Sequence, residues 1–198
     1  MMHKIPITIL LLSMLAISGQ VHATIVEFNQ DGLIKKGDEY DFVSVFDDAT
    51  VGMTGGVVEH LHADDSSTFI LFDGDIGWLV ASDSSKMYVY GGSIEHSLIV
   101  DRRSTVSLFG GTIGQNLTIP NFGKVNIYGY GFEWKPSESS GRNGSLSGYW
   151  LVGTPFIIPL RDLPEPFPGS QIVLIPEPST LLLLALGCLM LKKRNHSR

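Results

Sequence analysis

The sequence predicts an all-β fold, a short single-stranded β-solenoid of about five coils with an N-terminal signal peptide and a C-terminal apolar helix on either side. Three observations support this prediction. One motif occurs five times in the middle of the chain, its copies lie 18 or 19 residues apart, and apolar residues alternate with polar ones around each copy. Alternation with a period of two marks strands with one buried face, and a constant coil length is typical of stacked repeats.

The repeated motif is a step of one or two glycines that ends on an apolar anchor residue. Apolar residues stand seven and five positions before every anchor, and a second alternating apolar pair follows the first four anchors. The anchors are Val58, Ile76, Ile94, Ile113 and Phe132. The preceding positions are Val51, Met53, Phe69, Leu71, Met87, Val89, Val106, Leu108, Val125 and Ile127. The following positions are Leu61, Ala63, Leu79, Ala81, Leu98, Val100, Leu117 and Ile119. One coil cannot bury these side chains alone, so we expect them to form columns in a shared core.

The spacing within a coil bears on its handedness. A left-handed hexapeptide helix needs a six-residue period, but the inward positions between Val106 and Ile119 are 2, 5, 4 and 2 residues apart. The pattern therefore favours a right-handed β-helix. It resembles the short-coil helices of bactofilin-like polymers and the glycine-rich repeats of bacterial surface proteins. The alternative for the same strands is a meander sandwich, with turns at irregular intervals.

The N-terminal residues 1–23 have the three-part layout of a secretory signal peptide. A basic start precedes an apolar run over residues 5–17, and a small, polar stretch ends at Ala23. This layout predicts export through the Sec translocon and cleavage by signal peptidase after Ala23. An uncleaved membrane anchor is the alternative, but the run is shorter than the roughly 20 residues that span a bilayer.

The body divides by composition into four parts. Residues 24–39 form a lead-in segment, and the solenoid repeats occupy residues 40–134, beginning near Tyr40. Residues 135–160 are expected to close the solenoid: serine and glycine up to residue 148 predict a loop, and the rest suits one or two strands. Residues 161–175 are rich in proline and predict an extended linker, which includes a Pro-Glu-Pro at 164–166 with no apolar run behind it.

The last segment, residues 176–198, combines a second Pro-Glu-Pro, an apolar run over 181–191 and a basic cluster. A short apolar helix that ends in bases predicts a membrane segment whose charges stay on the cytoplasmic side. The whole arrangement resembles the PEP-CTERM sorting signal of Gram-negative bacteria, which is recognised by exosortase, a membrane cysteine transpeptidase. The resemblance implies that the apolar run is a transient inner-membrane anchor. By the same resemblance, the sorting motif is Pro176, Glu177 and Pro178, and the membrane stop is Lys192, Lys193 and Arg194.

Charge and cysteine content narrow the function classes. Residues 24–178 contain all 20 acidic residues of the chain but only 9 of its 14 bases, a net charge of −11. Nucleic-acid binding is not expected, because affinity for phosphate backbones comes from lysine and arginine. The single cysteine excludes a disulfide scaffold and a cysteine-rich zinc site. No phosphate-binding loop, nucleophile elbow or zinc-protease helix motif occurs, so no catalytic residues and no cofactor are predicted.

One repeated position combines aromatic and histidine residues two places after the anchors. Stacking of the coils would place these residues in one column: His60, Trp78, His96, Gln115 and Trp134. Such a column can bind carbohydrate or supply an acid or base, but we favour the simpler interpretation that the rings stack on each other. His60 and His96 would be two coils apart, near 10 Å, which is too far to share a metal ion.

Acidic residues gather at the expected turns. A calcium site is possible there, since oxygen ligands at turns suit that ion, but solvated turns explain the same residues and no metal site is predicted. The residues concerned are Asp64, Asp65, Asp73, Asp75, Asp83 and Asp101.

These observations predict a secreted bacterial protein with a structural or adhesive role at the cell surface or in an extracellular polysaccharide matrix. Exosortase is the expected processing partner, and an exopolysaccharide is the expected ligand class. Enzymatic activity is not expected. The alternatives are a carbohydrate-active β-helix enzyme and a calcium-dependent carbohydrate-binding module.

Overall fold

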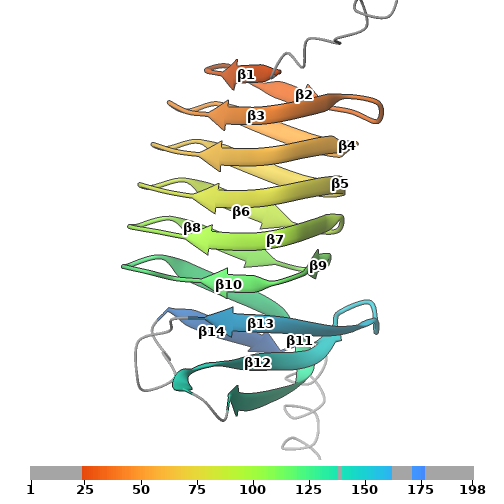
Figure 1. The fold of residues 1–198 in the computed structure, drawn as a ribbon, viewed down its shortest axis with the longest axis vertical. Helices are drawn as coiled ribbons and strands as arrows, with labels where there is room; N and C mark the ends of the chain where they lie inside the picture. The colour runs from red at the N-terminus through yellow and green to blue at the C-terminus, as the bar shows by residue number, and fades with distance from the viewer. Residues whose placement is uncertain (1–23, 138–139, 162–170, 177–198) are drawn as a thin grey trace, which may run out of the picture.

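The computed structural model describes residues 24–137, 140–161 and 171–176. In these residues every regular element is a β-strand, and the strands stack along one axis from the N-terminal to the C-terminal end (Figure 1). The prediction of an all-β solenoid of about five coils is therefore confirmed.

The described part of the chain contains fourteen strands. They are β1 (Ile25–Phe28), β2 (Gly32–Ile34), β3 (Glu39–Val45), β4 (Thr50–Ala63), β5 (Thr68–Ala81), β6 (Lys86–Val89), β7 (Ser93–Val100), β8 (Thr105–Leu108), β9 (Thr112–Ile113), β10 (Asn116–Thr118), β11 (Lys124–Ser137), β12 (Ser140–Trp150), β13 (Pro155–Arg161) and β14 (Ile172–Pro176).

Each coil contributes one strand segment to each of two parallel ladders. The front ladder, which faces the viewer in Figure 1, runs through β1, β3, the second halves of β4 and β5, then β7, β10 and β13. The rear ladder runs through β2, the first halves of β4 and β5, then β6, β8, β11 and β14. The front strands point to the left in Figure 1 and the chain returns behind them at a lower level, which is a right-handed winding.

The core consists of the columns that the repeat predicts. None of the eighteen apolar residues before and after the anchors is more than 2% exposed. Met53 and Leu71 lie one above the other on the rear ladder, and Leu61 and Leu79 do so on the front ladder. The core forms because these apolar side chains occupy alternate positions of the ladder segments and all point to the inside of the coil.

Two kinds of bend join the ladders, and each has a backbone reason. At the corner between the rear and front segments, Gly92 has φ of +75°, and a Cβ there would lie 2.7 Å from the carbonyl oxygen of Gly74. At the opposite turn, a non-glycine residue adopts φ between 53° and 59° in four successive coils: Asp47, Asp65, Asp83 and Arg102. Aspartate tolerates this left-handed conformation better than most residues, which accounts for its repeated use there.

The ends of the solenoid differ from the sequence-based expectations. The lead-in segment already contains β1, which pairs with β3, and β2, which pairs with β4, so parallel pairing begins ahead of Tyr40. The loop expected over residues 135–148 is wrong, because β11 and β12 form an antiparallel hairpin there, with Lys135 opposite Ser145. The glycines in this segment make room for a neighbouring ring and do not mark a loop, since a Cβ at Gly144 would lie 2.5 Å from the Trp134 side chain.

The expected linker also contains a strand. β14 pairs in parallel with β11, and Ile172 at its start is buried. Pro176, the first residue of the predicted sorting motif, is the last residue of this strand. Glu177, Pro178, Ala23 and the basic cluster at 192–194 lie outside the described residues, as do both apolar runs. Within the described residues, no helix is long and apolar enough to cross a membrane.

Candidate functional site: two aromatic columns and a sorting motif

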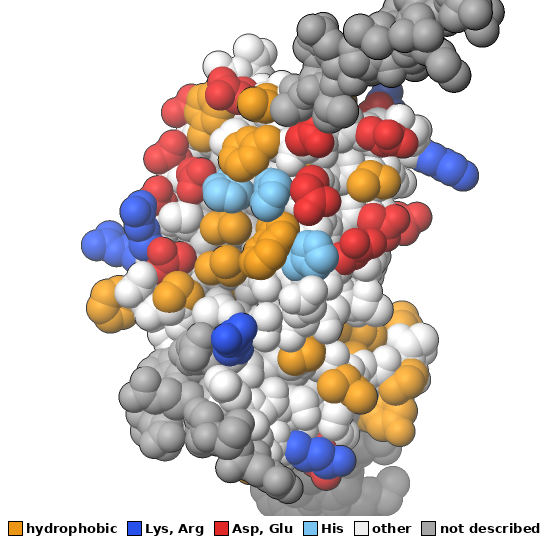
Figure 2. All heavy atoms as spheres, in the orientation of Figure 1, with side chains coloured by type: hydrophobic (Ala, Val, Ile, Leu, Met, Phe, Trp, Pro, Cys, Tyr) orange, Lys and Arg blue, Asp and Glu red, His pale blue; other side chains and the backbone are white. Residues whose placement is uncertain are grey.

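Three rings of the predicted column, His60, Trp78 and His96, lie on the front ladder. Together with Phe42 of β3, which the prediction did not include, we call them the front stripe. The ring centroids of His60 and Trp78 are 6.3 Å apart, with planes 16° from parallel, and those of Trp78 and His96 are 5.4 Å apart with planes at 49°. Phe42 adds a further ring 6.4 Å from His60. The stripe is partly exposed because its residues alternate with the buried leucine column. Figure 2 shows histidine and apolar side chains gathered on this face, with acidic side chains on both sides.

Two further residues of the predicted column have different positions. Gln115 continues the stripe, since its Nε2 donates a hydrogen bond of 3.0 Å to Nδ1 of His96. Trp134 lies on the β11–β12 hairpin, opposite Leu146. The strand that follows β10 in the front ladder is β13, through Leu117 and Leu160. The last copy of the repeat therefore leaves the solenoid path after its anchor.

A histidine outside the stripe, His62, lies beside it on β4. Its ring centroid is 4.9 Å from that of Phe42. Partial burial lowers the pKa of His62 below 6.5, the nearby carboxylate of Asp64 opposes that shift, and His60 adds to it. Partial burial likewise raises the pKa of Asp64 above 3.8, against the effect of His62. This part of the front face thus disfavours charge on both groups.

Metal ligands do not converge on the described surface. No three histidine, cysteine, aspartate or glutamate side chains in that part of the chain are placed to hold a metal ion. His60 and His96 are separated by the indole of Trp78, which contacts both rings. Of the turn acids that raised the possibility of calcium, Asp65 and Asp83 occupy the left-handed position of their turns.

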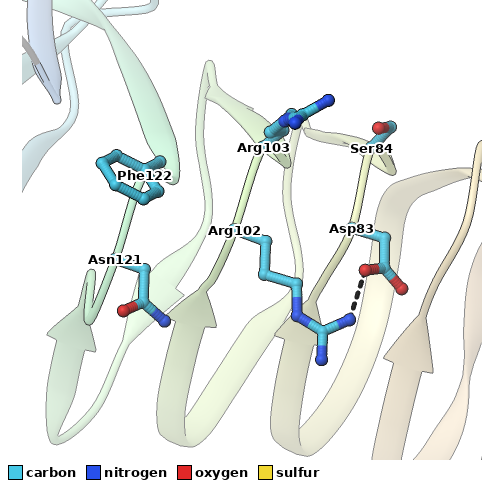
Figure 3. Close-up of a pocket in the computed structure, with 6 residues that line it drawn as sticks. All are labelled: Asp83, Ser84, Arg102, Arg103, Asn121 and Phe122. Carbon is cyan, nitrogen blue, oxygen red and sulfur yellow. Dashed lines mark hydrogen bonds and ion pairs between the residues drawn. The ribbon is translucent and has the colours of Figure 1, made fainter.

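A hollow of about 390 Å³ lies at the polar turns. Figure 3 shows the side chains that line it. Its lining residues are Asp83, Ser84, Arg102, Arg103, Asn121 and Phe122. The Arg102 guanidinium forms an ion pair with Asp83 of the preceding coil, which raises the pKa of Arg102 above its usual value. Asp101 accepts hydrogen bonds from the Arg102 backbone N–H at 2.7 Å and from the Asn121 amide. The Arg102–Asp83 ion pair and the Asn121–Asp101 hydrogen bond thus link the turns of successive coils.

The rear ladder carries a second column, the rear aromatic ladder: Phe72, Tyr90, Phe109 and Tyr128. Successive ring centroids are 5.4, 4.8 and 4.2 Å apart, and the planes lie within 17° of parallel. The column is not among the predicted site residues, although four of the five repeats place an aromatic residue four positions before the anchor. Neighbouring rings cover each other's faces, so the column presents mainly ring edges to solvent.

Residues 174–194 match the PEP-CTERM protein-sorting motif family, which confirms the resemblance of the tail to that signal. The chain is therefore a β-solenoid protein with a PEP-CTERM sorting motif. The motif implies a secreted surface protein that is targeted to exosortase, with export and a cell-envelope or surface destination. No curated protein and no solved structure matches the chain.

The matched region begins inside the folded body. Leu174 and Ile175 of β14 lie opposite Ile127 and Tyr128 of β11, and Pro176 lies opposite Gly129. The sequence pattern predicts that the sorting tail begins at Pro176 and that a linker precedes it. The run Ile172–Ile175 is short and wholly apolar with β-branched residues, and this was the available signal for a strand.

Proposed function

We propose that this protein is a structural or adhesive component of the bacterial cell surface or of an extracellular polysaccharide matrix. The signal peptide at residues 1–23 directs it through the Sec translocon, and signal peptidase removes that segment. The observation that carries the proposal is the continuity of β14 with the sorting motif. Because the motif begins within the last strand of the solenoid, exosortase receives the solenoid itself as its cargo.

The front stripe supports the adhesive part of the proposal. Its residues repeat at the coil spacing of about 4.8 Å, so they form a linear array along which a polysaccharide chain can lie. The tilt of 49° between Trp78 and His96 leaves part of the ring faces uncovered for sugar rings. The exposed carboxylates of Glu59 and Glu95, each next to a stripe residue in sequence, can accept hydrogen bonds from hydroxyl groups.

The sorting step is tested with two matched pairs of substitutions in a host that contains exosortase. Glu177→Ala with Pro178→Ala changes the motif, and Glu165→Ala with Pro166→Ala changes the other Pro-Glu-Pro, which no apolar run follows. We expect the first variant to keep its tail and remain in the membrane fraction, and the second to be processed normally. Intact mass and fractionation measure the result. Normal processing of the first variant would overturn the sorting proposal.

Adhesion is tested by sedimentation of the purified protein with extracellular polysaccharide from the same host. Trp78→Ala removes the central ring of the front stripe, and Tyr90→Ala removes a ring of the rear aromatic ladder as the matched control. We expect only Trp78→Ala to lose most of the binding. Equal binding by both variants would contradict adhesion through the front stripe. Release of soluble oligosaccharides that His96→Ala abolishes would favour the enzymatic alternative.

A further inference from the structure

The C-terminal end of the solenoid carries an exposed apolar patch, which we call the end patch. It consists of Tyr130, Tyr149, Leu151, Val152 and Ile157. Val152 is 81% exposed and Ile157 is 67% exposed. Figure 2 shows these apolar side chains gathered at the lower right, over the turn between β12 and β13. Contiguous exposed apolar surface of this kind marks protein or membrane contact sites.

The backbone holds the end patch in place. The β12–β13 turn is closed by hydrogen bonds from the Trp150 N–H to the Thr154 carbonyl (2.9 Å) and from the Gly153 N–H to the Trp150 carbonyl (2.8 Å). Trp150 and Phe156 are buried, and Val152 at the tip and Ile157 on the alternate side of β13 point outward. The rings of Tyr130 and Tyr149 stack at 5.4 Å beside the turn. The patch is therefore a fixed feature of the fold.

The chain leaves the solenoid next to this patch. Pro176 at the end of β14 pairs with Gly129, and Gly129 also pairs with Trp150 at the start of the β12–β13 turn. Residues 177–180 alone separate β14 from the apolar run at 181–191. Four extended residues reach at most about 14 Å. Insertion of the apolar run into a bilayer would thus bring the end patch to the membrane surface.

The charge of the body changes along the solenoid axis. Residues 24–115 contain 15 acidic and 5 basic residues, a net charge of −10, whereas residues 116–178 contain 5 acidic and 4 basic residues, a net charge of −1. Lys124, Lys135 and Arg161 are exposed at the C-terminal end. An anionic membrane surface attracts nearby lysine and arginine and repels the acidic coils. The electrostatic gradient therefore favours a bilayer at the C-terminal end.

We propose that the end patch docks on the surface of an anionic phospholipid bilayer while the tail is inserted. Val152, Leu151 and Ile157 then enter the interfacial region, and the basic residues lie at the level of the lipid phosphates. Docking fixes Glu177 and Pro178 at the membrane surface, where a membrane transpeptidase can reach them. The inference rests on the proposed function, because it requires the tail as an anchor.

The experiment uses the full chain with Cys188→Ser, reconstituted in vesicles of phosphatidylethanolamine and phosphatidylglycerol. A single cysteine, introduced as Val152→Cys or Ile157→Cys, carries an environment-sensitive fluorophore. Leu33→Cys, at the N-terminal end and also exposed, is the matched control. We expect a blue-shifted emission and severalfold stronger quenching by lipid-attached quenchers at positions 152 and 157 than at position 33. In phosphatidylcholine vesicles the difference should decrease.

The outcomes separate docking from anchoring. Chain that floats with the vesicles but shows water-exposed labels at both 152 and 157 would overturn docking and leave the tail anchor intact. Chain that does not float with the vesicles would overturn the anchor and docking together. Equal quenching in both lipid mixtures would overturn the role of anionic lipid.

Discussion

The front stripe and the rear aromatic ladder arise from the same coil period but differ in organisation. In the rear aromatic ladder, four phenylalanine and tyrosine rings stack nearly parallel, at separations of 4.2 to 5.4 Å. In the front stripe, imidazoles alternate with an indole at 5.4 to 6.3 Å, and one ring pair is tilted by 49°. Acidic side chains flank the front stripe (Figure 2).

The difference indicates how one repeat can serve two purposes. A column of like rings at the strand spacing satisfies the ring faces internally, so its main effect is to stabilise the stack of coils. A column of mixed and tilted rings among carboxylates leaves ring faces and polar atoms partly exposed, as the proposed adhesive role requires.

Substitutions in the core should destabilise the protein to a similar extent behind the front stripe and behind the rear aromatic ladder. Leu79 lies behind the front stripe and Leu71 behind the rear aromatic ladder, and both are fully buried. Each substitution to alanine is expected to lower the free energy of unfolding by about 2–5 kcal/mol, through lost transfer energy and a cavity. Chemical denaturation measures this. The control Phe122→Ala, at a side chain 84% exposed, should stay within about 0.5 kcal/mol of wild type. A cost below about 1 kcal/mol for either substitution would contradict the place of that leucine in the core.

The contribution of each ring in the rear aromatic ladder to stability should increase with the number of rings that stack on it. Tyr90 stacks between Phe72 and Phe109, whereas Phe72 is at the end of the ladder. At about 0.5–1.5 kcal/mol for each aromatic pair, Tyr90→Ala should cost about 1–3 kcal/mol beyond lost area, and Phe72→Ala about half of that. Thermal and denaturant unfolding of the two variants provide the comparison. A cost for Phe72→Ala as large as that for Tyr90→Ala would argue against stacking as the cause.

The front face should show a pH dependence that the rear face lacks. Burial lowers the folded-state pKa of His62 below 6.5, so the unfolded chain binds its proton more readily. The stability that neutral His62 provides is present above pH 6.5 and is lost as the pH falls through that value toward the lower folded-state pKa. The raised pKa of Asp64 acts in the opposite sense, since its contribution is present below 3.8 and is lost as the pH rises through the folded-state pKa.

His62→Gln separates the two contributions. We expect this variant to lose less stability than wild type when the pH is lowered through 6.5, and Tyr90→Ala to keep the wild-type slope. Unfolding curves across the pH range measure the slopes. Parallel slopes for wild type and His62→Gln would contradict the assignment to this histidine.

The smallest effect is expected at the turn ion pair between Arg102 and Asp83, whose side chains are both well exposed. Solvent screening limits such pairs, so Arg102→Ala should change the melting temperature only slightly. Arg102 also occupies the left-handed region, with φ of +54°. Arg102→Gly loses the same ion pair but relieves that backbone conformation. It should therefore be more stable than Arg102→Ala, and the opposite order would contradict strain from the left-handed backbone at this turn.

The repeated parts of this protein follow from its amino-acid sequence alone. Apolar side chains at fixed intervals specified the buried columns, because an alternating strand has only one face to bury. The constant coil length placed His60, Trp78 and His96 in one column, and the tail motif specified the sorting signal without any reference to the fold.

The strand pairing at the end of the repeat does not follow from the sequence pattern and is seen only in the tertiary structure. Trp134 lies on the β11–β12 hairpin, and β13 is the strand that pairs with β10 in the front ladder. β14, which follows the proline-rich segment in the sequence, pairs with β11. The physical reason is that each inner coil is held in register by a similar coil on both sides. The last coil has one such neighbour, so its open edge selects whichever later segment can pair with it and bury its apolar side chains.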